Sequence, residues 1–75
     1  MEVVVRRAHE AMRAQNWDDL RLLLHPYLHW TSSDGRTVRG RTKVMAMLAE
    51  RDPPLWPTSV EVWDDQIYRW QEPPN

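Results

Sequence analysis

The stretch that decides the fold is residues 24–48, which read LHPYLHWTSSDGRTVRGRTKVMAML. Apolar and polar residues alternate over Tyr27–Thr31, which predicts a strand, and Asp34-Gly35 is typical of the tight turn of a hairpin. The return strand is expected over Thr37–Arg39. Apolar residues then recur at helical spacing, which predicts a helix over Arg41–Arg51. This stretch therefore predicts a β-hairpin followed directly by a helix.

Two helices are expected before this hairpin. Residues Glu2–Gln15 carry apolar side chains at every third or fourth position, as on one face of a helix. Asn16 favours the start of a second helix over Trp17–Leu24, because its side chain can accept a hydrogen bond from the free amide of Asp19. Pro26 ends that helix, since a proline forces the residue before it out of the helical region.

A second hairpin is expected near the end of the chain. Three prolines lie within Asp52–Pro57 and predict a rigid connector, because each removes a backbone donor. Ser59–Trp63 and Gln66–Trp70 alternate in polarity around Asp64-Asp65, which suits a turn. From Glu72 onward the chain is expected to fray. The predicted fold class is α+β in the order ααββαββ, and the 75 residues are expected to form one domain with one modest core.

The composition restricts the possible roles of the chain. It contains no cysteine, so disulfides and thiolate metal ligands are excluded, and we predict neither a metal nor another cofactor. A net charge of −1 gives no field that would attract nucleic acid or anionic lipid. No apolar run reaches about 18 residues and the first residues lack the apolar core of a signal peptide, so we expect a cytoplasmic protein without a membrane span. Four basic residues gather without interleaved aromatics and are expected to be solvated rather than to bind nucleic acid. They are Arg36, Arg39, Arg41 and Lys43.

Three motifs resemble the nuclear transport factor 2-like superfamily and, within it, the small SnoaL-like proteins. They are NWDDL at 16–20, LHPYLHW at 24–30 and GRTKV at 40–44. The resemblance covers nearly the whole chain and implies three helices packed on a curved, mostly antiparallel sheet. In that family the sheet wraps a cone whose hollow often holds an apolar ligand, and the outer sheet face commonly forms a dimer.

This chain is shorter than the usual member of that family. The resemblance therefore implies that two strands or more are missing from the middle of the sheet, which leaves the cone shallow or open. An open sheet exposes unpaired backbone and apolar surface, which a second copy of the chain would cover most simply. We therefore predict a homodimer.

The resemblance also bears on catalysis. Ketosteroid isomerases of this superfamily use an inward aspartate as base and a tyrosine of the first helix as acid, and the resemblance places these at Ser32 and Ala8. Neither can replace the original residue in proton transfer. His9 and Ser32 stay as candidate catalytic residues, because histidine titrates near neutrality. His25 and His29 have a spacing that some zinc sites use, but the path from turn to strand is expected to separate their rings.

The predicted sites follow from the alternation of the strands. The expected ligand pocket is made of inward residues of the first helix and first strand, for which core packing is the alternative: Ala8, Met12, Leu28, Trp30 and Ser32. The expected dimer interface is made of aromatic residues of the second hairpin, with the two tryptophans as anchors on one face: Trp63, Tyr68 and Trp70. Glu61 and Arg69 are expected to form a cross-strand ion pair.

Two functions remain open from the sequence. The first is a small non-catalytic SnoaL-like dimeric module that binds an apolar small molecule or a protein partner. The second is a small isomerase, cyclase or hydrolase that acts on an apolar metabolite in the cone pocket. An enclosed hollow with two converging polar groups would favour the enzyme, and a solid interior would favour the module.

Overall fold

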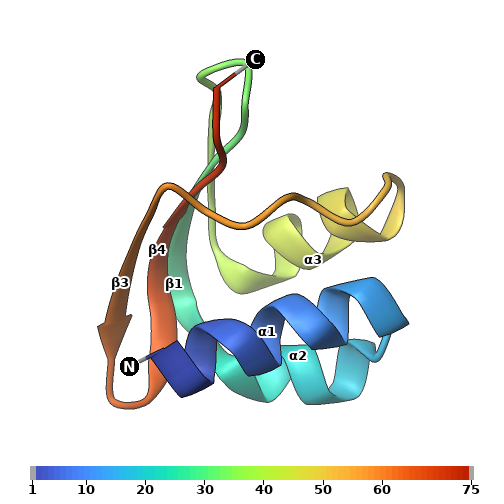
Figure 1. The fold of residues 1–75 in the computed structure, drawn as a ribbon, viewed down its shortest axis with the longest axis vertical. Coiled ribbons are helices and arrows are strands. Elements are labelled where there is room, and N and C mark those ends of the chain that lie inside the picture. The colour runs from blue at the N-terminus through green and yellow to red at the C-terminus, as the bar shows by residue number, and fades with distance from the viewer. Residues whose placement is uncertain (1, 75) are drawn as a thin grey trace.

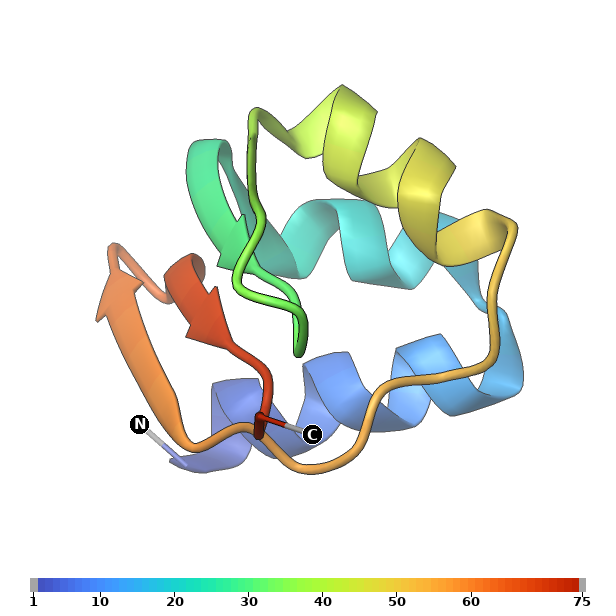
Figure 2. The same cartoon turned by 90° about the horizontal axis from the view of Figure 1, so that it is seen from above.

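The computed structural model describes residues 2–74 and contains the predicted elements in the predicted order (Figure 1). The helices and strands are α1 Glu2–Ala14, α2 Trp17–Leu23, β1 Leu24–Thr31, β2 Thr37–Arg39, α3 Arg41–Ala49, β3 Ser59–Trp63 and β4 Gln66–Gln71. The three helices lie on one side of a curved sheet (Figures 1 and 2). The α+β class and the order ααββαββ are thus confirmed.

The sheet has four strands in the order β2-β1-β4-β3. Strand β1 pairs antiparallel with β2 and parallel with β4, while β3 and β4 form the closing antiparallel hairpin. The sheet is mixed but mostly antiparallel, as predicted. Because β4 pairs directly with β1, the expected loss of strands does not interrupt the sheet, and β3 becomes its edge.

Strand β1 begins at Leu24, three residues before its predicted start. Its pairing with β4 jumps from Leu24 opposite Ile67 to His29 opposite Arg69, so four residues of β1 face one residue of β4. Pro26 lies in this irregular part, where no ladder hydrogen bond from its nitrogen is needed. The prediction that Pro26 lies outside the strand is therefore wrong, because the extra residues let the strand bend past the proline.

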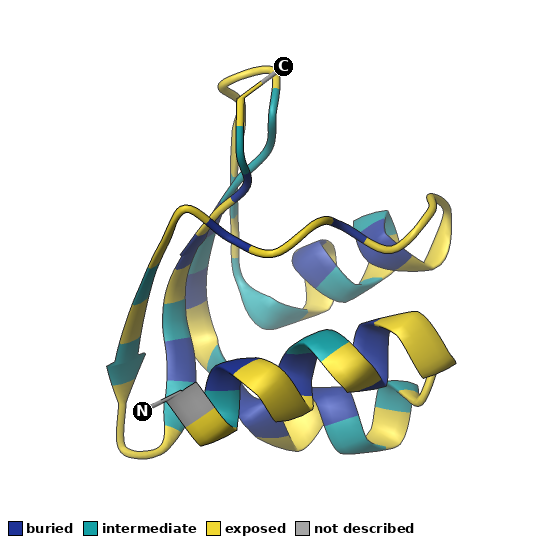
Figure 3. Cartoon of the chain, in the orientation of Figure 1, coloured by how far each residue is buried: buried dark blue, intermediate teal, exposed yellow. Residues whose placement is uncertain are grey.

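The core lies between the concave face of the sheet and the helices, where buried residues gather (Figure 3). Trp30 of β1 and Trp70 of β4 are direct partners, and their rings stack with centroids 4.9 Å apart and an interplanar angle of 5°. Each helix adds apolar side chains to this pair. They include Met12 of α1, Leu20 of α2 and Val44 of α3, all at most 1% exposed.

The turns use the residues that their backbone angles require. Asp64 and Asp65 have φ angles of 52° and 61°, in the left-handed region that aspartate tolerates, which confirms the predicted tight turn between β3 and β4. Gly40 precedes α3 with φ of 94°, which only glycine adopts without strain. These angles fix where each strand ends.

Asn16 caps α2 as predicted, because its Oδ1 accepts a hydrogen bond from the Asp19 amide at 3.3 Å. We expect Asn16→Ala to lower the free energy of unfolding by about 1 kcal/mol, since it leaves that amide without its acceptor. Asn16→Asp keeps an acceptor and is the control that should unfold at nearly the wild-type urea concentration. Equal loss in both variants would show that the cap does not stabilise the helix.

Candidate functional site

Four of the five predicted pocket residues lie in the packed core, and the fifth, Ser32, is partly buried outside it. Ala8, Met12, Leu28 and Trp30 are at most 1% exposed and belong to one cluster of packed side chains. Leu28 and Trp30 point inward while His29 and Thr31 are only partly buried, so the predicted faces of β1 are confirmed. None of these core residues lines the surface hollows described below. The alternative of ordinary core packing is therefore the one that the structure favours.

The two candidate catalytic residues do not converge. The hydroxyl of Ser32 donates to the sulfur of Met47 in α3 at 3.8 Å. His9 lies on a different surface, where its Nε2 donates to the carbonyl of Pro54 at 2.9 Å. Its ring and the ring of Trp56 form a T-shaped pair with centroids 5.5 Å apart. His9 thus fastens the proline-rich connector to α1, and Ser32 holds α3 against the end of β1.

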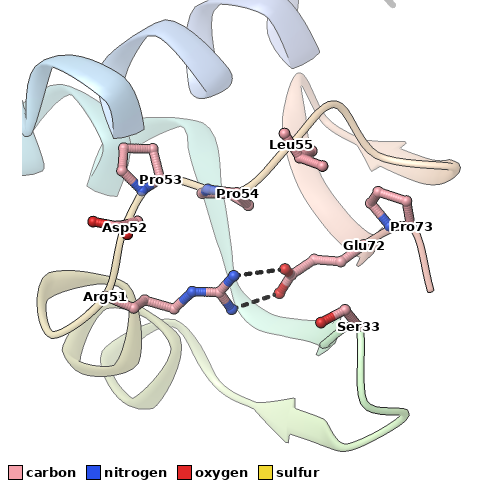
Figure 4. Close-up of a pocket in the computed structure, with 8 residues that line it drawn as sticks. All are labelled: Ser33, Arg51, Asp52, Pro53, Pro54, Leu55, Glu72 and Pro73. Carbon is pink, nitrogen blue, oxygen red and sulfur yellow. Dashed lines mark hydrogen bonds and ion pairs between the residues drawn. The ribbon is translucent and has the colours of Figure 1, made fainter. Parts of the chain in front are cut away.

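Glu72 is a buried acid that the sequence interpretation missed. It is 5% exposed, and its Oε2 accepts a hydrogen bond from the indole Nε1 of Trp30 at 2.7 Å. Arg51 donates to both carboxylate oxygens at 2.8 Å in a bidentate pair (Figure 4). The Glu72 amide donates to the carbonyl of Thr31 at 2.9 Å, so the chain stays paired with β1 beyond β4. The expected fraying from Glu72 is therefore wrong. The signal was the period-two spacing from Trp70, which places Glu72 on the inner face.

The Glu72 carboxylate is a structural acceptor. Three donated hydrogen bonds occupy its two oxygens, and the Arg51 guanidinium balances its charge. Around the pair is an open hollow of about 340 Å³ at the surface (Figure 4). Its lining also includes Ser33, Asp52, Pro54 and Pro73. The arrangement joins β1, the segment after α3 and the segment after β4.

The outer face of the sheet carries an aromatic cluster, which we call the outer cluster: His25, Tyr27, His29, Trp63 and Tyr68. Trp63 and Tyr68 stack with centroids 4.1 Å apart and an interplanar angle of 7°. The ring centroids of His25 and His29 lie 5.1 and 5.4 Å from that of Tyr68. The two histidines are therefore brought to one aromatic ring, which the expected separation of their rings did not anticipate.

A β-bulge places Tyr68 on the outer face. Glu61 pairs with Arg69 and the next residue, Val62, pairs with Ile67, so Tyr68 has no partner on β3. Ile67 and Trp70 are both buried, and the two residues between them point outward. Trp70 is thus in the core, contrary to its predicted place in the interface. A regular strand would have put Tyr68 and Trp70 on the same face.

One ion pair lies beside the outer cluster. Arg69 Nε lies 3.6 Å from Glu61 Oε1, which confirms the predicted cross-strand ion pair. Glu61 also accepts a hydrogen bond from the indole of Trp63.

Arg41 donates to the carbonyls of Arg21 and Leu24 at 3.4 Å, so it satisfies the C-terminal end of α2. This basic residue is therefore accounted for by the fold.

The comparisons with known proteins identify the fold. No family model and no curated protein matches the chain. Among solved structures, the chain is similar to a putative ketosteroid isomerase from Kribbella flavida DSM 17836, with a TM-score of 0.78 and 13% identity. The match covers 93% of this chain and 73% of the other. This chain has the nuclear transport factor 2-like fold. Identity this low shows the fold alone.

A membrane span requires a helix of sufficient length and apolar character. None of the helices within residues 2–74 is long and apolar enough to cross a membrane.

We expect Arg51→Ala to lower the free energy of unfolding by about 2 kcal/mol, because it leaves the buried Glu72 carboxylate without its counter-charge. The Arg51 side chain is 34% exposed, so water offsets part of the about 3–5 kcal/mol that a fully buried pair would lose. Arg36→Ala is the matched control, since its ion pair with Asp34 lies at the surface and should contribute less than about 1 kcal/mol. Urea unfolding of the two variants measures the difference, and equal losses would contradict the role of the buried pair.

Proposed function

We propose that this chain is a non-catalytic binding module of the nuclear transport factor 2-like fold that pairs with a second copy through its outer sheet face. The observation that carries the proposal is the division of aromatic side chains between the two faces. The inner face is packed around the stack of Trp30 on Trp70, whereas Tyr27 and Trp63 of the outer cluster are exposed. A protein partner suits such a surface better than an enclosed small molecule.

The inner face supports a role without catalysis. An active site needs a hollow in which at least two polar groups converge. Ser32 bonds to Met47, His9 bonds to the connector, and the hydrogen-bond acceptors of Glu72 are taken up by Trp30 and Arg51. These three side chains are thus engaged separately in holding the fold.

The outer face supports pairing with a second copy. Trp63 is 49% exposed, Tyr27 is one of the most exposed large apolar residues, and no helix covers this face within residues 2–74 (Figure 2). Aromatic residues and arginine are enriched at the centre of protein interfaces. Arg69 and Glu61 give the patch both signs of charge, so two copies related by a twofold axis could exchange ion pairs.

A native mass spectrum of the purified protein tests the proposal first. We expect a species of twice the 9.0 kDa of one chain and no additional mass, because the interior is filled. A co-purified metabolite would contradict the solid interior and favour the alternative of a small enzyme. A species of one chain only at tens of micromolar would contradict the dimer.

The two half-exposed tryptophans allow a matched test of the interface. Trp63 in the outer cluster is 49% exposed and Trp56 in the connector is 52% exposed. We expect Trp63→Ala or Tyr68→Ala to weaken dimerisation at least about tenfold, as loss of a central aromatic anchor does. Trp56→Ala should leave the dimer intact. Sedimentation equilibrium measures all three, and equal weakening by Trp56→Ala would show that the effect comes from general destabilisation.

A further inference from the structure

The edge of the sheet at β3 is open. β3 is the last strand in the sheet order and, among residues 2–74, it pairs with β4 only. Figures 1 and 2 show no described segment beyond it on the side away from β4. A strand at such an edge presents unpaired backbone N–H and C=O groups. The opposite edge, β2, has only three residues, so β3 with five is the longer free edge.

A groove of about 260 Å³ lies beside β3 on the inner side of the sheet, and both apolar side chains and the polar residues Thr58 and Ser59 line it. Val60 and Val62 of β3 form one wall and are partly buried, and Val5 of α1 forms another. Trp56 and Pro57 of the connector also line it. A strand added to β3 would point every second side chain toward this groove, because side chains alternate along a strand. The groove therefore fits apolar residues at alternate positions.

The charges near this edge indicate what the other positions carry. Glu61 lies on the outer side of β3, and Asp64 and Asp65 are exposed in the turn that follows. Glu61 pairs with Arg69, and no basic group within residues 2–74 lies in ion-pair distance of Asp64 or Asp65. A second copy of β3 would bring the same acids to the edge, where like charges are destabilising. Basic side chains are complementary.

We propose that the β3 edge docks an extended segment of another protein in which apolar residues alternate with lysine or arginine. The segment adds a fifth strand to the sheet through backbone hydrogen bonds. Its apolar side chains enter the groove beside Val60, Val62 and Trp56, and its basic side chains lie on the outer side near Glu61 and the aspartate turn. The groove contains no residue of the outer cluster, and the two sites adjoin at Glu61, so the inference goes beyond the proposed dimer.

A peptide titration tests the proposal. The probe is a synthetic peptide of three Lys-Val repeats with blocked ends, added to the full-length ¹⁵N-labelled chain and followed by NMR. We expect saturable shifts of the amides of Ser59–Trp63 that weaken as salt is raised, because the charges are exposed. A peptide of three Glu-Val repeats should bind at least tenfold more weakly. Equal binding of both peptides, or no shift of the β3 amides at millimolar peptide, would overturn the proposal.

Two kinds of variant separate the groove from the charges. Trp56→Ala removes a side chain that lines the groove and should weaken binding of the Lys-Val peptide at least tenfold. Leu55→Ala removes the neighbouring exposed side chain of the same connector, which does not line the groove, and should leave the affinity unchanged. The double variant Asp64→Asn and Asp65→Asn keeps residues that tolerate the turn angles, and it should reduce the salt dependence. Equal effects of Trp56→Ala and Leu55→Ala would overturn the groove as the binding site.

The dimer and the edge site fail independently. Tyr68→Ala is expected to weaken dimerisation at least about tenfold by sedimentation while retaining peptide binding, because Tyr68 lies outside the groove. Trp63 of β3 belongs to the proposed dimer interface, so this control uses Tyr68→Ala, in which the outer cluster is broken. In that variant, shifts of the β3 amides that depend on protein concentration alone, without peptide, would show that a second copy occupies the edge. That result would overturn the peptide site, whereas a monomeric wild-type chain that still binds the peptide would overturn only the dimer.

Discussion

The stack of Trp30 on Trp70 is the contact on which the rest of the structure depends. It joins β1 to β4, strands separated by 34 residues of chain between Thr31 and Gln66, and all three helices pack onto the cluster that contains it. Two indole rings fill a volume that would otherwise be a hollow, and large aromatic residues supply much of the burial in a small core. A filled interior is the reason why the binding that we propose is assigned to the surface.

Only one of the two indole N–H groups of this stack donates a hydrogen bond among residues 2–74. Trp30 donates to Glu72, whose charge is balanced by Arg51, so three segments meet at one carboxylate. The Nε1 of Trp70 has no partner among residues 2–74, and nothing in the structure explains it. Burying a polar group without a partner costs about 1–3 kcal/mol, which a small domain tolerates only if its other contacts are strong. The buried ion pair therefore matters more here than surface ion pairs usually do.

Two irregularities in strand pairing decide what the outer face displays. The extra residues of β1 let the strand bend past Pro26 and bring His25 onto the same ring as His29. The bulge at Tyr68 turns that ring outward to stack on Trp63, while Trp70 stays inside. The outer cluster is thus a product of two irregularities in strand pairing. The open edge of β3 is also decided by the pairing of the strands, because β3 is the last strand in the sheet order.

The sequence by itself determined the elements, because each depends on local periodicity and on local capping or turn chemistry. The order ααββαββ, the Asn16 cap, the Asp64-Asp65 turn and the inward face of β1 were all predictable in this way. Only the tertiary structure decided the parallel pairing of β1 with β4, the burial of Glu72 against Arg51, and the side on which Trp70 lies. These depend on contacts between residues distant in the chain and on bulges, and a shift of one residue in a strand reverses every face beyond it.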